Sequence, residues 1–201
     1  MCAKILIIDH NDSFTYNLVQ LLEEANAETI AVRAFDDIFF DEINLFDGII
    51  LSPGPALPKD YPSSLELIKK FYQTKSILGV CLGMQMIVEC FGGELYNLQN
   101  VQHGRQVEVF KENDCALFNH ISFPFKVGLY HSWAMNKDKI VDDLLITSRT
   151  KDGVPMSLKH SEYNTFGVQF HPESYMTEHG LQLMKNWLNC ISHRANGETE
   201  K

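Results

Sequence analysis

The sequence lacks the patterns that mark several common classes of protein. No apolar run approaches the roughly 18 residues of a membrane span. None of the 5 cysteines are spaced as Cys-x-x-Cys, and the 8 histidines form no His-Glu-x-x-His, so we expect neither a disulfide framework nor a metal site. No glycine-rich stretch carries Gly-Lys-Ser or Gly-Lys-Thr, which excludes a P-loop for ATP. We therefore expect no metal and no cofactor.

The length and net charge of the chain further restrict the classes of protein to which it can belong. The chain has 201 residues and a formal net charge of −9, which argues against a nucleic-acid-binding surface and suits an enzyme with a small zwitterionic substrate. One domain is predicted over residues 1–191, followed by a polar tail without fixed structure at residues 192–201. The chain starts directly in an apolar strand with no cleavage site after it, so we expect a cytoplasmic protein without membrane contact.

The first half alternates between apolar strands and stretches of helical periodicity. This alternation predicts a three-layer, doubly wound α/β fold with a mostly parallel sheet. Asp12 or Ser13 is expected to cap the first helix, and Ser63 with Glu66 to form a capping box for a later one. Strands are predicted at residues 5–9 and 29–33, in a run that ends at Ser52, and at residues 76–78; a helix is predicted at residues 82–91.

The second half has a different pattern. Residues 106–110 and 155–159 alternate between apolar and polar side chains, which predicts antiparallel strands with one open face. Residues 165–170 are expected to form a further strand. A last helix is predicted at about residues 178–191, with Trp187 among its core positions. Antiparallel additions to the parallel sheet are therefore predicted.

The pentapeptide Gly79-Val80-Cys81-Leu82-Gly83 joins a strand-like run to a helix-like run. A Gly-x-nucleophile-x-Gly sequence at such a turn is typical of a nucleophile elbow, where the glycines avoid collisions and the nucleophile is exposed. The cysteine stands at a helix N-terminus, where free N–H groups and the helix dipole favour its thiolate. Free cysteine is also often a small buried apolar residue, so this motif alone does not decide between the two interpretations.

Residues His171-Pro172-Glu173 supply what a cysteine nucleophile needs. Cysteine chemistry requires a base that takes and returns a proton, and a third group that orients the base. His171 is the candidate base and Glu173 the candidate orienting group. Pro172 favours an extended backbone at His171, which places the two side chains on roughly one face. The order Cys, His, Glu on an α/β pattern predicts a catalytic triad.

The run from Gly48 to Pro55 predicts a buried strand that ends in a rigid Pro-Gly-Pro loop. Acyl transfer needs backbone donors where negative charge develops on the carbonyl oxygen. One donor in elbow folds is the N–H after the nucleophile, here Leu82, and the other comes from a neighbouring strand-end loop. Gly54 is the candidate for the second donor, although a purely structural turn gives the same pattern.

Together these motifs resemble those of the class I (triad) glutamine amidotransferases, and most closely component II of anthranilate synthase and of aminodeoxychorismate synthase. The resemblance covers about residues 4–191. The cysteine and His-Pro-Glu motifs mark the whole class, whereas the Asp-Ser-Phe-Thr-Tyr-Asn run at residues 12–17 is typical of the chorismate-using branch. The resemblance implies an amidotransferase fold with a flavodoxin-like core and glutaminase activity. It also implies that glutamine is bound by Gln85 and by the backbone of Ser132 and Trp133.

The resemblance further implies that the partner is a chorismate-binding synthase subunit. The glutaminase domain accounts for the whole length, so no part of the chain remains to bind an acceptor for ammonia. Candidate partner contacts are Asp12 and Ser13, together with a turn at His103 and Gly104. The sequence does not separate anthranilate from aminodeoxychorismate synthesis.

Three alternatives stay open from the residues. The first is the glutaminase part of another amidotransferase, such as one for GMP or carbamoyl-phosphate synthesis, which would usually carry a larger flanking domain. The second is a non-catalytic regulator of amidotransferase type, which would be expected to lack a triad residue. The third is a cysteine peptidase of related fold, against which Gln85 and the Pro-Gly-Pro loop weigh.

Overall fold

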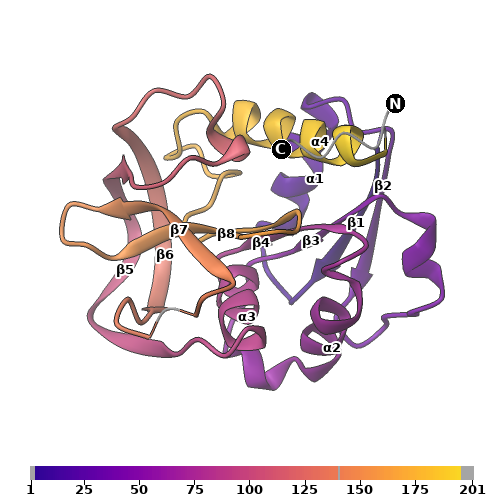
Figure 1. Cartoon of the computed structure of the whole chain (residues 1–201), viewed down its shortest axis with the longest axis horizontal. Coiled ribbons are helices and arrows are strands. Elements are labelled where there is room, and N and C mark those ends of the chain that lie inside the picture. Colours follow the sequence, from indigo (N-terminus) through magenta and orange to yellow (C-terminus); the bar gives the residue numbers. More distant parts are fainter. Residues whose placement is uncertain (1–2, 140, 196–201) are drawn as a thin grey trace.

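The computed structural model describes residues 3–139 and 141–195. Their strands form one nine-stranded sheet in the order β2-β1-β3-β4-β9-β8-β7-β5-β6. Helices cover both faces of its first half: α1 and α4 lie on one side, α2 and α3 on the other (Figure 1). The prediction of a three-layer, doubly wound α/β fold with antiparallel additions is confirmed.

The parallel half explains the apolar runs of the sequence. Alternate residues of one strand enter two separate cores: Ile5 and Ile7 pack toward α1 and α4, whereas Leu6 and Ile8 pack toward α2 and α3. A strand covered on both faces must be apolar at every position, which is why these runs show no alternation. The parallel strands are β1 (Lys4–Asp9), β2 (Thr29–Ala34), β3 (Gly48–Leu51), β4 (Ser76–Val80) and β9 (Thr165–Val168).

The antiparallel half extends the sheet away from the helices. β9 pairs with β8 in antiparallel orientation, and the strands beyond it continue that way. In Figure 1 they form the part of the molecule opposite β1 and β2. The strands are β5 (Leu95–Lys111), β6 (Phe125–Met135), β7 (Leu144–Thr150) and β8 (Pro155–His160).

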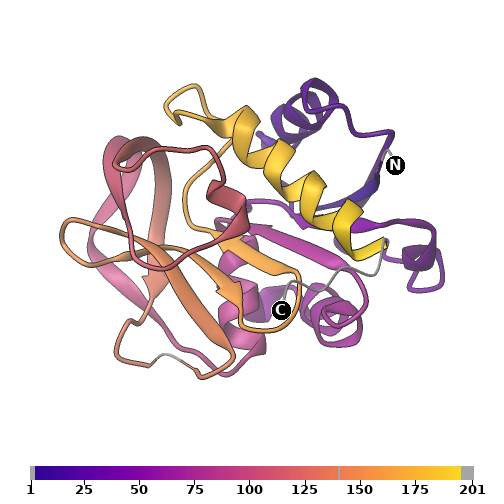
Figure 2. The same ribbon diagram turned by 45° about the horizontal axis from the view of Figure 1, so that its top comes forward.

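The helices begin and end close to the predicted positions, with differences at their first turns. The helices are α1 (Thr15–Glu24), α2 (Pro62–Phe71), α3 (Leu82–Cys90) and α4 (Gly180–Ala195), and short 3₁₀ turns lie at Glu42–Leu45, Pro58–Asp60 and Ala116–Phe118. α4 crosses one face of the parallel strands (Figure 2). It continues four residues past Ile191, into the stretch expected to be a tail; residues 196–201 lie outside the described residues.

Both predicted side-chain caps are wrong. α2 begins at Pro62, and no side chain caps it, because proline is favoured at the first helical position and needs no partner for an N–H. At α1 the N-cap position is Phe14. The Asp12 carboxylate instead accepts a hydrogen bond of 2.7 Å from the Phe14 N–H, which tightens the loop ahead of the helix.

A close approach of backbones holds the first turn of α3 against the sheet. A Cβ placed on Gly79 would lie 2.4 Å from the carbonyl carbon of Gly83, and one on Gly83 would lie 2.4 Å from the carbonyl oxygen of Leu51. Real Cβ atoms do not approach backbone atoms so closely, and these neighbours are backbone atoms that no rotamer change can move. The two glycines of the elbow motif are therefore required by packing.

We expect Gly83→Ala to lower the free energy of unfolding by about 1–3 kcal/mol, the usual consequence of forcing a methyl group into a packed core. Denaturant unfolding measures the change. The matched control is Gln20→Ala on the exposed face of α1, which should change stability by less than about 0.5 kcal/mol. A Gly83→Ala protein as stable as this control would contradict the packing described here.

Candidate functional site

Cys81 lies on the turn between β4 and α3 in a conformation that residues with a side chain rarely adopt. Its φ is +52° and its ψ is −100°. Its N–H donates to the Val168 carbonyl of β9 at 2.8 Å, which ties the turn to the neighbouring strand. Backbone strain of this kind costs of order 1–3 kcal/mol and persists where surrounding structure imposes it, often at functional sites. The elbow predicted from the sequence is thus present.

His171 and Glu173 form a buried pair in the loop after β9. The Nδ1 atom of His171 lies 2.7 Å from Oε1 of Glu173, and both side chains are almost fully buried. Burial lowers the pKa of His171, but interactions with Cys81 and Glu173 raise it, and the net result lies well above its usual 6.5. Because Glu173 takes Nδ1, the interaction with Cys81 falls to Nε2, which makes no hydrogen bond of ordinary geometry within the described residues. It is therefore free to exchange a proton with a reacting group.

The loop after β3 places Gly54 against the first residue of α3. A Cβ on Gly54 would lie 2.9 Å from the Leu82 side chain and 2.7 Å from the His10 carbonyl oxygen, so only glycine fits. The Leu82 N–H belongs to the first helical turn, whose N–H groups have no partner within the helix. Gly54 and Leu82, the residues predicted to supply the oxyanion donors, thus lie close together.

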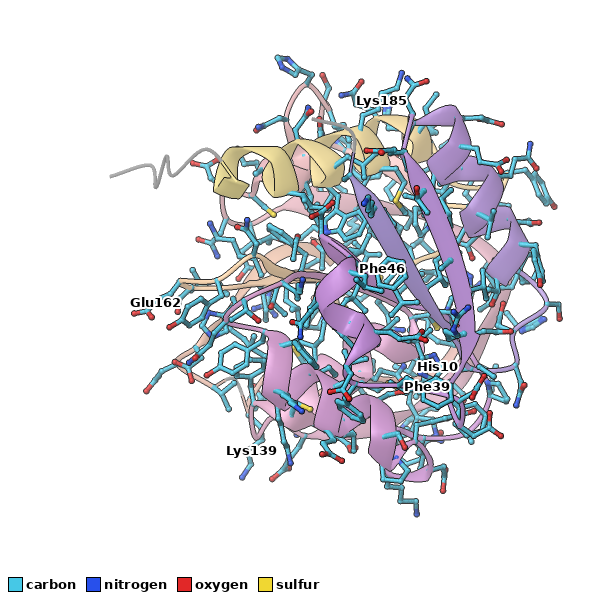
Figure 3. The ribbon with its side chains drawn as sticks, turned by 90° about the vertical axis from the view of Figure 1, so that its right-hand side faces the viewer. His10, Phe39, Phe46, Lys139, Glu162 and Lys185 are labelled. Atoms are coloured by element: carbon cyan, nitrogen blue, oxygen red, sulfur yellow. The ribbon has the colours of Figure 1, made fainter. Side chains whose placement is uncertain are left out.

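His10 packs against the loop that carries Gly54 and is hydrogen-bonded to Ser52 in that loop. Its backbone N–H donates to the Ser52 hydroxyl at 2.9 Å, and its Nε2 lies 2.9 Å from the Ser64 hydroxyl of α2. The ring also packs edge-on against Tyr61. In Figure 3, His10 lies at the end of the strands farther from α4. Burial lowers the pKa of His10 to about 4, so the ring is neutral near pH 7.

Two of the predicted glutamine-binding residues, Gln85 and Trp133, are joined in one hydrogen-bond network. Gln85, on α3, is buried, and its Nε2 donates to the Trp133 carbonyl of β6 at 2.9 Å. His131 Nδ1 donates to the same carbonyl at 2.8 Å. Ser132, between them on β6, is half-buried. The network joins α3 to the antiparallel half of the sheet.

The four predicted interface residues are at least partly exposed. Ser13, His103 and Gly104 are exposed and Asp12 is half-buried. The predicted turn at His103 is wrong: this residue and Gly104 lie within β5, at an irregularity in its pairing with β6, and Gly104 has a φ of +65°. A bulge of this kind admits a positive φ without ending the strand.

Aromatic rings join this surface to His171. The ring centroids of His103 and Tyr130 are 5.4 Å apart, and those of Tyr130 and His171 are 4.9 Å apart. Phe14 contacts both Tyr130 and His171. The segment that contains Asp12 is therefore in contact with His171 through the Phe14 side chain.

Sequence reasoning missed three buried polar residues of this region: His10, His131 and Gln169. Gln169 donates from Nε2 to the Cys81 sulfur at 3.6 Å. A polar residue inside an apolar strand run was the available signal for Gln169. In the described residues, no group of three or more His, Cys, Asp or Glu side chains is arranged to hold a metal ion. None of the helices there is long and apolar enough to span a membrane.

The lowered pKa of His10 predicts a loss of stability in acid. An unfolded histidine with a pKa near 6.5 takes up a proton before the folded one does, so stability is lost as pH falls from 6.5 toward 4. At 1.36 kcal/mol per pH unit, the contribution reaches about 3 kcal/mol. His131, whose pKa burial also lowers to about 4, acts in the same direction, and His171, with its raised pKa, acts in the opposite one.

In denaturant unfolding at several pH values, His10→Asn should lose less stability than the unmodified chain between pH 6.5 and 4. The comparison isolates His10 because the other histidines are common to both proteins. Parallel curves would show that His10 titrates alike in the folded and unfolded states.

Some known proteins are similar to this chain in sequence, and others are similar to it in fold. The model of the family "Glutamine amidotransferase class-I" matches residues 6–190. Anthranilate synthase component 2 of Cyanophora paradoxa is 41% identical over 191 residues, which cover 94% of this chain and 100% of the relative. Aminodeoxychorismate/anthranilate synthase component 2 of Bacillus subtilis is 38% identical over 186 residues, covering 92% and 95%. A crystal structure from Thermoplasma acidophilum, assigned to a GMP synthase, shares the fold with a TM-score of 0.87, 22% identity and 99% coverage of both chains. The chain belongs to the class I glutamine amidotransferases.

Proposed function

We propose that this chain hydrolyses the side-chain amide of glutamine and passes the ammonia to a chorismate-using synthase subunit. The observation that carries the proposal is the strained Cys81 elbow beside the buried His171–Glu173 pair. A non-catalytic regulator would have no need of this arrangement. The relatives named as component 2 of anthranilate and aminodeoxychorismate synthases support the choice of acceptor.

In the first half of the reaction, the Cys81 sulfur attacks the amide carbon of glutamine. The carbonyl oxygen gains negative charge, which the N–H groups of Gly54 and Leu82 stabilise. His171 gives its proton to the departing nitrogen, so that ammonia leaves and a thioester to Cys81 remains. The raised pKa of His171 suits this role because the ring carries a proton before the attack.

In the second half, water releases glutamate from the thioester. His171, now neutral, takes a proton from the water as the water attacks the thioester carbon, and the Cys81 sulfur leaves. Glu173 accepts a hydrogen bond from Nδ1 and keeps Nε2 directed at the reacting atoms. The cycle therefore ends with the same proton arrangement with which it began.

The partner is proposed to dock over the surface formed by Asp12, Ser13, His103 and Gly104. Docking there would cover the aromatic contacts that reach His171 through Tyr130. Ammonia is a small neutral base that water would protonate and disperse, so a partner seated over the site keeps it for the acceptor. The proposal does not choose between the anthranilate and aminodeoxychorismate products.

The first test measures glutamate formed from glutamine by the chain alone and with each candidate synthase and chorismate. We expect turnover that rises with one synthase. Cys81→Ser should remove it almost entirely, since loss of the nucleophile in a comparable serine enzyme lowers kcat by about 10⁶-fold. The variant should keep the unfolding midpoint of the unmodified chain. Glutamate formation that survives this substitution would remove Cys81 from the reaction.

Gln85→Ala should raise the KM for glutamine by about tenfold, which corresponds to about 1.4 kcal/mol, the upper part of the range for one hydrogen bond between neutral groups. The reason is that Gln85 fixes the Trp133 carbonyl and with it the backbone proposed to bind glutamine. Steady-state kinetics on the complex provide the measurement, and Gln182→Ala on α4 is the control. An unchanged KM would exclude Gln85 from the substrate site.

A further inference from the structure

Gln169 lies beside the nucleophile because of strand register. β4 and β9 are parallel, and Val80 pairs with Val168. The next residues, Cys81 and Gln169, therefore leave the sheet at the same carboxyl edge. Gln169 is fully buried, and its Nε2 lies 3.6 Å from the Cys81 sulfur. Burying an amide costs free energy unless the amide is hydrogen-bonded. The hydrogen bonds of Gln169 therefore decide whether this position is favourable.

The hydrogen bonds of Gln85 fix the orientation of the Gln169 side-chain amide. The Trp133 carbonyl can only accept, so the amide of Gln85 must turn its Nε2 toward that carbonyl. The same Nε2 donates to Oε1 of Gln169 at 3.3 Å. The Nε2 of Gln169 must then face Cys81, since a flipped amide would place two donors against each other. The sulfur is therefore held as a hydrogen-bond acceptor.

A donor that faces the sulfur favours its anionic form, since hydrogen bonds to charged groups are stronger than those between neutral groups. His171 also faces the sulfur, but it must give up its proton to ammonia during the reaction. The amide of Gln169 does not titrate and donates at every stage. It can therefore stabilise the sulfur when the sulfur leaves the thioester as an anion, while His171 is taking a proton from water.

We propose that Gln169 is a further catalytic residue, whose side-chain amide, oriented through Gln85 by the Trp133 carbonyl, stabilises the Cys81 thiolate. This inference rests on the proposed glutaminase function. The side-chain amides of Gln85 and Gln169 then link the backbone proposed to bind glutamine to the Cys81 sulfur. The proposal predicts that Gln169 affects the reactivity of Cys81 even when no glutamine is present.

The test is the rate at which iodoacetamide, a neutral reagent, alkylates Cys81 at pH 8 without glutamine. Mass spectrometry of the Cys81 peptide resolves it from the other cysteines; burial raises the pKa of Cys90 and Cys115 to about 11, which slows them. Gln169→Met, which has no donor, should react about tenfold more slowly, as expected for one hydrogen bond to a charged group. Gln182→Met, which loses an amide on α4, should react within about twofold of the unmodified chain.

The substitution Gln169→Glu tests whether Gln169 acts as a hydrogen-bond donor to the sulfur or only by holding Gln85 in place. Its carboxylate still accepts from Gln85 but offers the sulfur no donor, so we expect slow alkylation and a kcat for glutamine that falls more than KM changes. Slow alkylation of Gln169→Met together with a normal rate for Gln169→Glu would overturn the proposal, because Gln169 would then act only by holding Gln85. Normal rates for both variants would overturn it as well.

The same assay separates this inference from the proposed function. Fast alkylation of Cys81 that depends on Gln169, in a chain that forms no glutamate with any synthase, would contradict the glutaminase proposal and support the role of Gln169. Glutamate formation that Gln169→Met leaves unchanged would support the glutaminase and contradict the role of Gln169. Unfolding midpoints of all variants show whether each rate belongs to a folded protein.

Discussion

The structure depends on the contact between the first turn of α3 and the carboxyl ends of β3 and β4. Gly83 lies against the Leu51 carbonyl, and Gly79 lies against Gly83, with no room for a side chain at either position. Cys81 lies between these two glycines in the sequence and has a positive φ. The conformational strain at Cys81 is therefore stabilised by the packing of two cores.

The remaining parts of the site come from the junction between the parallel and antiparallel halves of the sheet. Ligands of open α/β sheets bind beyond the carboxyl ends of parallel strands, and the last of these strands here is β9. Its end supplies Gln169 and His171, while β6 of the antiparallel half supplies the Trp133 carbonyl. The antiparallel half closes one side of the site and adds residues that a purely parallel sheet would not place there.

Much of this architecture could be read from the sequence because each feature depends on local chemistry. The apolar run of β1 predicts a strand covered on both faces, and Gly79 with Gly83 predicts an elbow around Cys81. The length of β5 and the bulge at Gly104 could not be predicted from the sequence, because both depend on pairing with β6, which lies later in the chain. The buried roles of His10 and Gln169 depend on contacts with residues more than 40 positions away, which no local pattern encodes.

The central claim is that Cys81 is the nucleophile that attacks glutamine, and a glutamine analogue with a diazoketone side chain tests it most directly. Such a reagent binds as glutamine does and forms a stable bond to the attacking atom. We predict that peptide mass spectrometry finds the adduct on Cys81 alone, that labelling and loss of glutamate formation proceed together, and that excess glutamine slows both. An adduct on Cys90, Cys115 or Cys190, or full activity in a chain labelled at Cys81, would contradict the account.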